Sequence, residues 1–256
     1  MSESDSPIVG EFHPKLAIIG GRLEDDNAAI YEEMRRLSGG RIVVFATASS
    51  VPDEVGAETV GVFSAYGFDA VLAGVHGAGA AEAAQDQAIA DLIADYGSVY
   101  FTGGDQALIT GALAPFGRES RVLKAIRKAQ RNGALAAGSS AGAAIMSDVM
   151  ISGGTSLEAA TYGVVDDPDQ PGMLLEPGLG FFPWGMVDQH FLKRGRFGRL
   201  VVGMQATGAK RGFGIDENTA LFVEGRNAQV IGEYGAFVLD FEHAVVDRSR
   251  SLIENI

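Results

Sequence analysis

The 256-residue chain contains no cysteine. A disulfide framework, a metal site built on thiolates and a thiol nucleophile are therefore excluded, and covalent catalysis has to use an oxygen or nitrogen nucleophile. Positive charge is also scarce, because 20 Lys and Arg residues face 33 Asp and Glu residues and leave a net charge of −13. The field of such a chain repels phosphate groups, so we expect no nucleic acid and no anionic membrane among its partners.

Long apolar runs and targeting signals are missing as well. No uninterrupted apolar stretch approaches the length of a membrane span, and the first residues lack the basic and apolar regions of a secretory signal. With 46% hydrophobic and 21% charged residues, the composition is that of a globular protein. We therefore expect a soluble, cytoplasmic protein in which residues 1–14 form a flexible tail and residues 15–256 a single domain.

Short apolar runs alternate with amphipathic stretches along the chain. The runs predict strands at residues 15–20, 41–48, 68–74, 98–102 and 134–138. The amphipathic stretches predict helices at about residues 25–37, 52–66, 79–96, 105–114, 118–132 and 195–207. Residues 154–178, rich in Gly, Pro and Asp, are expected to form a loop or hairpin before strand-like segments at 212–224, 227–234 and 236–246. Apolar strands separated by helices predict an α/β fold, with a mostly parallel sheet and helices on both faces.

Residues 138–142, Gly-Ser-Ser-Ala-Gly, fit the G-x-S-x-G pattern of a nucleophile elbow. In such an elbow a strand ends in a sharp turn that exposes the Ser140 hydroxyl, and the next helix points its N-terminus at the site. A helix N-cap serine in a glycine-rich turn fits the same pattern. The apolar run before the motif and the small residues after it favour a nucleophile, with the N–H of Ala141 as an oxyanion donor.

A serine nucleophile needs a base, and the chain has four histidines. His190 lies between polar residues in the sequence Asp-Gln-His-Phe, at the end of an expected strand. For an isolated histidine, a hydrogen-bonded structural role is the commoner explanation. An esterase arrangement of Ser140, Asp216 and His243, with residues 76–79 as the oxyanion loop, is the other enzymatic possibility, since its chain order is that of the α/β-hydrolases.

Three arginines, Arg194, Arg196 and Arg199, follow the candidate base within a few residues. A run of charge is usually a solvated face. In a chain of net charge −13, however, this cluster indicates carboxylate recognition, because the planar guanidinium binds a carboxylate through two hydrogen bonds. The Gly-Gly-Asp-Gln turn at 103–106 is expected to end a strand at the same sheet edge, where the N–H of Gly104 would be the second oxyanion donor.

Four blocks of sequence together carry a family signature: FTGGDQ (101–106), AAGSSAGA (136–143), DQHFLKRGRFGRL (188–200) and GFGIDENTA (212–220). In this order they resemble the serine peptidase family of the cyanophycinases and the bacterial aspartyl dipeptidases. The resemblance extends from about Lys15 to Val246, and the DQHF block with its arginines is similar to the cyanophycinase branch. It implies a class I glutamine amidotransferase-like fold, a homodimer, and no cofactor or metal.

By this resemblance, Ser140 is the nucleophile, His190 is the base and Glu217 is the acid that orients the base. Residues 214–219 are expected on a strand, so Asp216 and Glu217 point to opposite faces and only one of them can serve a given site. The residues implied in substrate binding are Gln106, Asp188, Gln189, Arg194, Arg196 and Arg199.

The implied activity is that of a serine exopeptidase that forms an acyl-enzyme and releases β-Asp-Arg dipeptides from cyanophycin, a polyaspartate with an Arg on each β-carboxyl. We expect the arginines to clamp a substrate carboxylate and Asp188 to pair with a substrate guanidinium. Two further alternatives stay open. In the first, the chain is an aspartyl dipeptidase or a related isopeptidase of the same family. In the second, it is a protein that binds Asp- or Arg-rich peptides without turnover.

Overall fold

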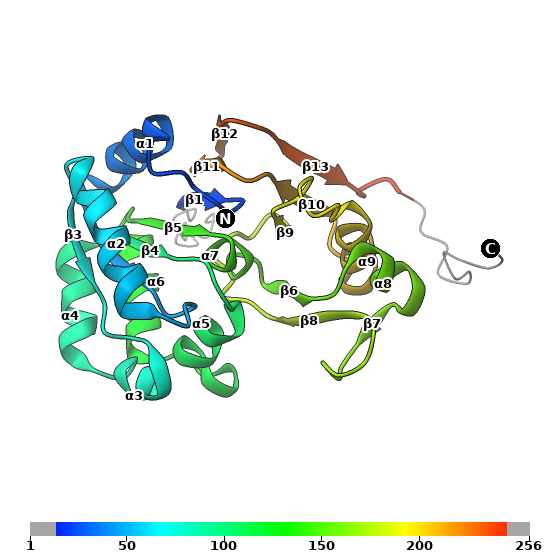
Figure 1. Cartoon of the computed structure of the whole chain (residues 1–256), viewed down its shortest axis with the longest axis horizontal. Helices are drawn as coiled ribbons and strands as arrows, with labels where there is room; N and C mark the ends of the chain where they lie inside the picture. The colour runs from blue at the N-terminus through cyan, green and yellow to red at the C-terminus, as the bar shows by residue number, and fades with distance from the viewer. Residues whose placement is uncertain (1–13, 245–256) are drawn as a thin grey trace, which may run out of the picture.

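A seven-stranded sheet forms the centre of the molecule, in a computed structural model that describes residues 14–244 (Figure 1). Its strands, in spatial order, are β12 (Asn227–Gly232), β11 (Thr219–Glu224), β1 (Lys15–Ile19), β5 (Leu135–Ser139), β4 (Val99–Phe101), β2 (Arg41–Phe45) and β3 (Asp69–Leu72). The five strands from β1 to β3 pair in parallel, whereas β11 and β12 are antiparallel additions at the β1 side. This arrangement confirms the predicted mostly parallel α/β sheet.

Helices cover both faces of this sheet. On one face, α1 (Ala28–Ser38) and α2 (Pro52–Ala65) enclose a core that includes Ile19, Met34 and Phe63. On the other face, a larger core is built by side chains of α4 (Gln87–Tyr96), α5 (Gln106–Leu113), α6 (Arg121–Arg131) and α7 (Ala141–Ala144). The short α3 (Ala80–Ala83) also packs against this core. Alternate residues of each strand enter opposite cores, as the two-residue period of a strand requires.

The second half of the chain adds two small three-stranded sheets beside the large one (Figure 1). One contains β13 (Ala236–Asp240), β10 (Arg211–Ile215) and β9 (Met186–Gln189), and the other contains β6 (Val149–Gly153), β8 (Met173–Pro177) and β7 (Val164–Val165). The helices α8 (Ser156–Tyr162) and α9 (Phe197–Thr207) contact each other over a third apolar core. Because β10 leads directly into β11, the turn between them joins a small sheet to the large one.

Three sequence expectations about elements were wrong. The helix predicted at 79–96 is divided into α3 and α4, because the Asp86 side chain accepts a hydrogen bond from the N–H of Ala88 and starts a new helix. The loop predicted at 154–178 contains α8, β7 and β8. The strand predicted at 212–224 is interrupted at residues 216–218, so Asp216 and Glu217 lie in a turn. The predicted tail lies, up to residue 13, outside the described residues.

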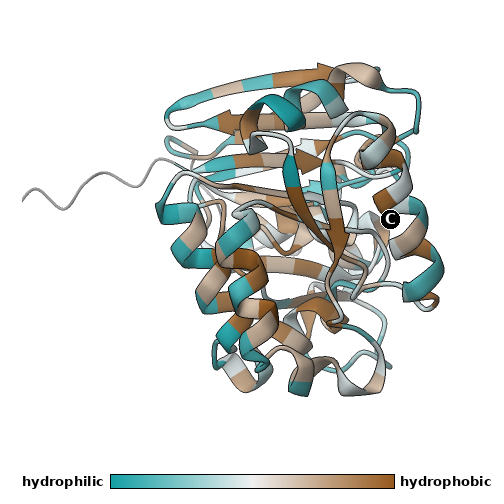
Figure 2. Cartoon of the chain, turned by 90° about the vertical axis from the view of Figure 1, so that its left-hand side faces the viewer, coloured by the Kyte–Doolittle hydropathy of each residue, from teal (hydrophilic) through white to brown (hydrophobic). Residues whose placement is uncertain are grey.

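The longer helices that flank the sheet carry polar and apolar residues on different faces. Figure 2 shows hydrophilic and hydrophobic residues side by side on the helices that flank the sheet. In α6 the apolar Val122, Leu123 and Ile126 are buried between exposed basic residues. Within residues 14–244, no helix combines the length and the apolar composition needed to cross a membrane.

Candidate active site

The serine of the G-x-S-x-G motif stands at a strained turn between β5 and α7. Ser140 has φ 54° and ψ −106°, a backbone conformation that non-glycine residues rarely adopt. A Cβ on Gly138 would lie 2.3 Å from the carbonyl oxygen of Gly142, and one on Gly142 would lie 2.3 Å from that of Phe101. The two glycines of the motif are therefore required by close backbone approach, as expected for an elbow.

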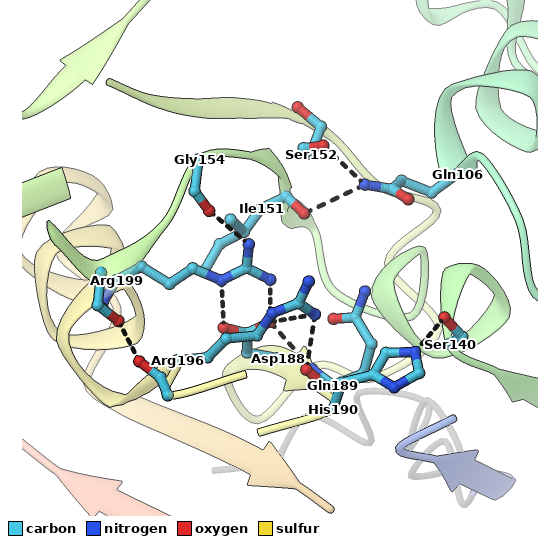
Figure 3. Close-up of polar contacts among 12 residues, drawn as sticks. Gln106, Ser140, Ile151, Ser152, Gly154, Asp188, Gln189, His190, Arg196 and Arg199 are labelled. Atoms are coloured by element: carbon cyan, nitrogen blue, oxygen red, sulfur yellow. Dashed lines mark hydrogen bonds and ion pairs between the residues drawn. The ribbon is translucent and has the colours of Figure 1, made fainter. Parts of the chain in front are cut away.

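A continuous chain of contacts leads from this serine to a carboxylate. Ser140 Oγ lies 2.7 Å from His190 Nε2, and His190 Nδ1 lies 2.7 Å from Glu217 Oε1 (Figure 3 shows the first contact). His190 directly follows β9, and Glu217 occupies the turn between β10 and β11. With a carboxylate at Nδ1, the ring proton belongs on Nδ1 and the lone pair of Nε2 faces the hydroxyl.

The imidazole of His190 is held in its neutral form. Its side chain is 5% exposed, and burial lowers the pKa of His190 below its ordinary value of 6.5. Glu217 acts in the opposite direction, while the positive charges of Arg194 and Arg196 lower the pKa further. The net direction is downward, so this ring can accept a proton at neutral pH.

The loop after β1 contacts each segment that carries one of these three residues. The N–H of Ser140 donates to the carbonyl of Ile19 at 3.0 Å, and the N–H of His190 donates to that of Gly20 at 2.6 Å. The N–H of Asn218, next to Glu217, donates to the carbonyl of Gly21 at 2.8 Å. Residues 19–21 thus fix the spacing of the three segments through backbone atoms. The sequence predicted a strand at residues 15–20 here and no role for Gly20 and Gly21 in the site.

Gly21 also makes room for the imidazole. It has φ 116°, and a Cβ there would lie 2.2 Å from Cε1 of His190 and 2.4 Å from Nε2. Any side chain at Gly21 therefore displaces the ring. Two consecutive glycines at the carboxyl end of a predicted parallel strand were the signal in the sequence that pointed to such a role.

The two turns that carry the predicted oxyanion donors, Gly104 and Ala141, lie close to Ser140. Ala141 is the first residue of α7, where a backbone N–H has no acceptor within the helix. The turn after β4 approaches from the other side, since a Cβ on Gly103 would lie 3.2 Å from the Cβ of Ser140. Gly104, with φ 137°, leaves no space for a side chain because a Cβ would meet the carbonyl oxygen of Ala48 at 2.0 Å. The sheet edge thus brings both turns together.

Asp188 has a different partner from the one expected. Its side chain is fully buried, and its Oδ2 and Oδ1 accept hydrogen bonds from Nε and Nη2 of Arg199 at 2.7 and 2.5 Å (Figure 3). The Nη1 of Arg199 donates to the carbonyl of Gly154 at 2.7 Å. Asp188 and Arg199 form a buried two-pronged ion pair within the protein. Asp188 is therefore not placed to pair with a substrate guanidinium, and every nitrogen of the Arg199 guanidinium has a protein acceptor.

Arg194 and Arg196, the other two arginines of the cluster, line a pocket of about 320 Å³ beside the proposed triad. Arg196 donates to the carbonyl of Gln189 at 2.7 Å and lies 3.6 Å from Asp188 Oδ1. Burial, followed by repulsion from Arg199, lowers the pKa of Arg196 to about 10, so the side chain is still a cation at neutral pH. Arg194 is exposed. These two arginines are the cations of the cluster that a ligand can reach.

The two glutamines of the predicted set line the same pocket. Gln106, the first residue of α5, donates from Nε2 to the carbonyls of Ser152 at 3.0 Å and Ile151 at 3.4 Å (Figure 3). The buried Oε1 of Gln189 has no hydrogen-bond partner among the described residues. An unpaired buried oxygen is costly, so a donor from a ligand would stabilise it.

The residues of the esterase alternative are not assembled around Ser140. His243 is exposed after β13, and His76 lies 3.5 Å from Asp53. Asp216 Oδ1 accepts a hydrogen bond from the N–H of Leu192 and so supports the segment after His190. In the part of the chain that the structure describes, no group of His, Asp and Glu side chains has the arrangement of a metal site.

Comparisons with known proteins identify the family of the chain. The model of peptidase family S51 matches residues 16–231. A cyanophycinase of Trichormus variabilis is 34% identical over 202 residues, which are 78% of this chain but 63% of that relative. A cyanophycinase of Geminocystis herdmanii is 32% identical over 232 residues, or 88% of this chain and 80% of the relative.

The fold also matches that of a solved protein. The crystal structure of a peptidase from an acI-B1 Actinobacterium superposes with a TM-score of 0.69 and covers 90% of this chain and 92% of that one. At 19% identity this similarity concerns the fold alone. The family model covers most of the chain, including the segments with the elbow, the histidine and the turn at residues 216–218. The chain belongs to peptidase family S51.

Proposed function

We propose that this chain is a serine peptidase that hydrolyses cyanophycin to β-Asp-Arg dipeptides. The observation that carries the proposal is the chain of two 2.7 Å contacts from Ser140 through His190 to Glu217, beside a pocket lined by arginines. Membership of family S51 and the similarity to cyanophycinases support the choice of substrate. The polymer offers one carboxylate and one guanidinium per unit, and the pocket offers cations to the carboxylate.

In the first half of the reaction, Ser140 Oγ attacks the carbonyl carbon of the scissile amide while His190 Nε2 takes the hydroxyl proton. Glu217 stabilises the imidazolium that forms, and the N–H groups of Gly104 and Ala141 stabilise the oxyanion. The tetrahedral intermediate then collapses. The carbon–nitrogen bond breaks, the imidazolium gives its proton to the departing amine, and the acyl group stays on Ser140 as an ester.

In the second half, a water molecule replaces the departed amine. His190 removes a proton from this water as its oxygen attacks the ester carbonyl. Collapse of the second tetrahedral intermediate releases the carboxylic acid, and the proton returns to Ser140 Oγ. The two half-reactions thus regenerate the free enzyme and consume one water molecule per amide bond broken.

Substrate recognition is assigned to Arg194 and Arg196, which bind a carboxylate, and to Gln106 and Gln189, which line the same space. Asp188 acts through Arg199, because their buried pair fixes the wall that carries Arg196. Removal of dipeptides from a chain end requires a receptor for a terminal carboxylate. Arg196, which is partly buried in the wall of the pocket, supplies a cation for such a carboxylate.

The experiment is incubation with purified cyanophycin, followed by mass analysis of the products. Release of β-Asp-Arg by the wild-type chain, and its loss in Ser140→Ala, is the expected result. Cleavage of aspartyl dipeptides without cleavage of cyanophycin would replace the proposal by the dipeptidase alternative. If neither is cleaved and a serine-directed inhibitor fails to label Ser140, the chain is a peptide-binding protein.

A further inference from the structure

The pocket beside Ser140 needs an anion if it is to hold a zwitterionic ligand. Asp188 does not provide one, since both of its oxygens are bound by Arg199 and its side chain is fully buried. Among the described residues that line the pocket, Glu158 is the one carboxylate. It lies in residues 154–178, which were expected to form a loop or hairpin, and it was not among the predicted site residues.

A capping box holds Glu158 in place at the start of α8. Thr155 Oγ1 accepts a hydrogen bond from the N–H of Glu158 at 3.2 Å, and Glu158 Oε2 accepts one from the N–H of Thr155 at 2.8 Å. These bonds lower the pKa of Glu158 below its usual value, so the side chain is ionised at neutral pH. Within residues 14–244, hydrogen bonds use Oε2 and leave Oε1 for a ligand.

The helix that carries Glu158 is tied to the loop that carries the accessible arginines. Ser156 Oγ donates to the carbonyl of Gly195, between Arg194 and Arg196, at 2.5 Å. The same hydroxyl accepts a hydrogen bond from the N–H of Arg199 at 3.2 Å. The segments that carry Glu158 and the arginines are therefore tied together by hydrogen bonds, which limits their relative movement before a ligand arrives.

We propose that Glu158 forms a guanidinium subsite and determines specificity for an arginine unit. The inference rests on the proposed function and sharpens it. The arginine of a β-Asp-Arg unit carries a carboxylate and a guanidinium on one residue. Arg196 and Arg194 bind the first of these groups, and Glu158 Oε1 accepts hydrogen bonds from the second. A unit with a neutral side chain loses the charge-assisted bond at Glu158 and keeps the carboxylate contact.

The test compares two matched ligands, β-Asp-Arg and β-Asp-citrulline, whose urea group replaces the guanidinium at nearly the same size. Their binding to Ser140→Ala is measured by calorimetric titration, with and without Glu158→Gln. Glutamine also serves at the third position of a capping box, so this change removes charge and keeps the helix cap. We expect Ser140→Ala to prefer β-Asp-Arg by roughly tenfold, and the added Glu158→Gln to reduce the preference to within about twofold.

Kinetics give the second readout. With oligomers of each unit, Glu158→Gln in the otherwise wild-type chain is expected to raise KM for the arginine oligomer about tenfold and to leave kcat within about twofold. Thr155→Ala is the matched control, since it removes the hydroxyl of the helix cap but keeps the Glu158 carboxylate and the backbone N–H of residue 155 that holds it. It lowers the melting temperature and leaves the preference between the two ligands unchanged.

An unchanged preference in Glu158→Gln, in binding and in kinetics, would overturn the inference and leave Glu158 as a helix cap. The proposed function fails in a different way, when the wild-type chain cleaves neither oligomer. In that case the titrations test the guanidinium subsite alone. A preference for β-Asp-Arg that depends on Glu158 supports the subsite in a chain without peptidase activity. If this preference is absent, both the subsite and the proposed function are refuted.

Discussion

The two sides of the site are held by different means. Ser140, His190 and Glu217 are spaced by backbone hydrogen bonds to residues 19–21. The pocket wall is held by side chains instead, through the buried pair of Asp188 with Arg199 and the bonds of Ser156. Gly20 and Gly21 have no space for a side chain, so substitutions there disturb the triad directly. Substitutions among the side-chain contacts of the pocket wall change the strength of individual contacts. We therefore expect variants on the triad side to lose turnover and variants on the pocket side to change affinity, stability or pH dependence.

The largest effect is expected at Ser140. Ser140→Ala removes the proposed nucleophile, and the turnover number should fall on the order of 10⁶-fold because the residues of a catalytic triad act as a unit. Thermal denaturation should show a folded protein with a melting temperature within a few degrees of the wild type. His190→Ala should be about as damaging, while His243→Ala, which changes an exposed residue, should leave turnover nearly unchanged. The reverse result for the two histidines would refute the triad.

Asp188→Asn tests the pocket wall. The change leaves Arg199 as a buried cation without a counter-charge, and the free energy of unfolding should fall by about 3–5 kcal/mol. Urea denaturation measures it. Glu33→Gln is the control, because it breaks an ion pair with Arg36 whose arginine side chain is 54% exposed, and the loss of stability should be much smaller. Equal losses in the two variants would show that burial adds nothing to the Asp188 pair.

Gly21→Ala is the sharpest probe of the triad side. Its methyl group has to push the imidazole of His190 aside, and kcat should fall roughly 10²-fold, as expected for a displacement of about 1 Å. Gly39→Ala is the matched control. Gly39 also has a positive φ, of 68°, but has open space around it, so Gly39→Ala brings the backbone strain without the collision. Turnover that falls equally in both variants would attribute the effect to strain alone.

The smallest effect is a shift in pH dependence. Since activity requires neutral His190, kcat/KM falls as the pH drops through the pKa of His190, which lies below 6.5. Arg194→Gln removes a positive charge that lowers this pKa, so the acidic limb should move to higher pH by about half a unit or less. A small uncharged ester substrate keeps the measurement independent of carboxylate binding. Lys193→Gln serves as the control, and a shift of the limb in that variant alone would contradict the assignment.

The sequence was informative where function requires an unusual local pattern. The order of apolar strands and helices predicted the parallel sheet, and the glycines around Ser140 predicted a tight turn that close backbone contacts now explain. Side-chain pairs that depend on tertiary packing were harder to predict. Asp188 and Arg199 lie eleven residues apart, and their burial as an ion pair depends on the packing of α8 against α9. Glu158 was missed because a Gly-, Pro- and Asp-rich composition hid a seven-residue helix, although Thr155 and Glu158 have the spacing of a capping box.

The central place of β1 has a consequence for synthesis of the protein. This N-terminal strand pairs with β5 on one side and with β11 on the other, where Ile19 faces Ala220. Its glycine loop can therefore align the serine, the histidine and the glutamate only after the ribosome has made nearly the whole chain. Contacts between residues so distant in sequence also form late in folding, because closing a long loop costs entropy first. A nascent chain that ends before Glu217 would carry the proposed nucleophile without its acid, so hydrolytic activity would arise only with the completed fold.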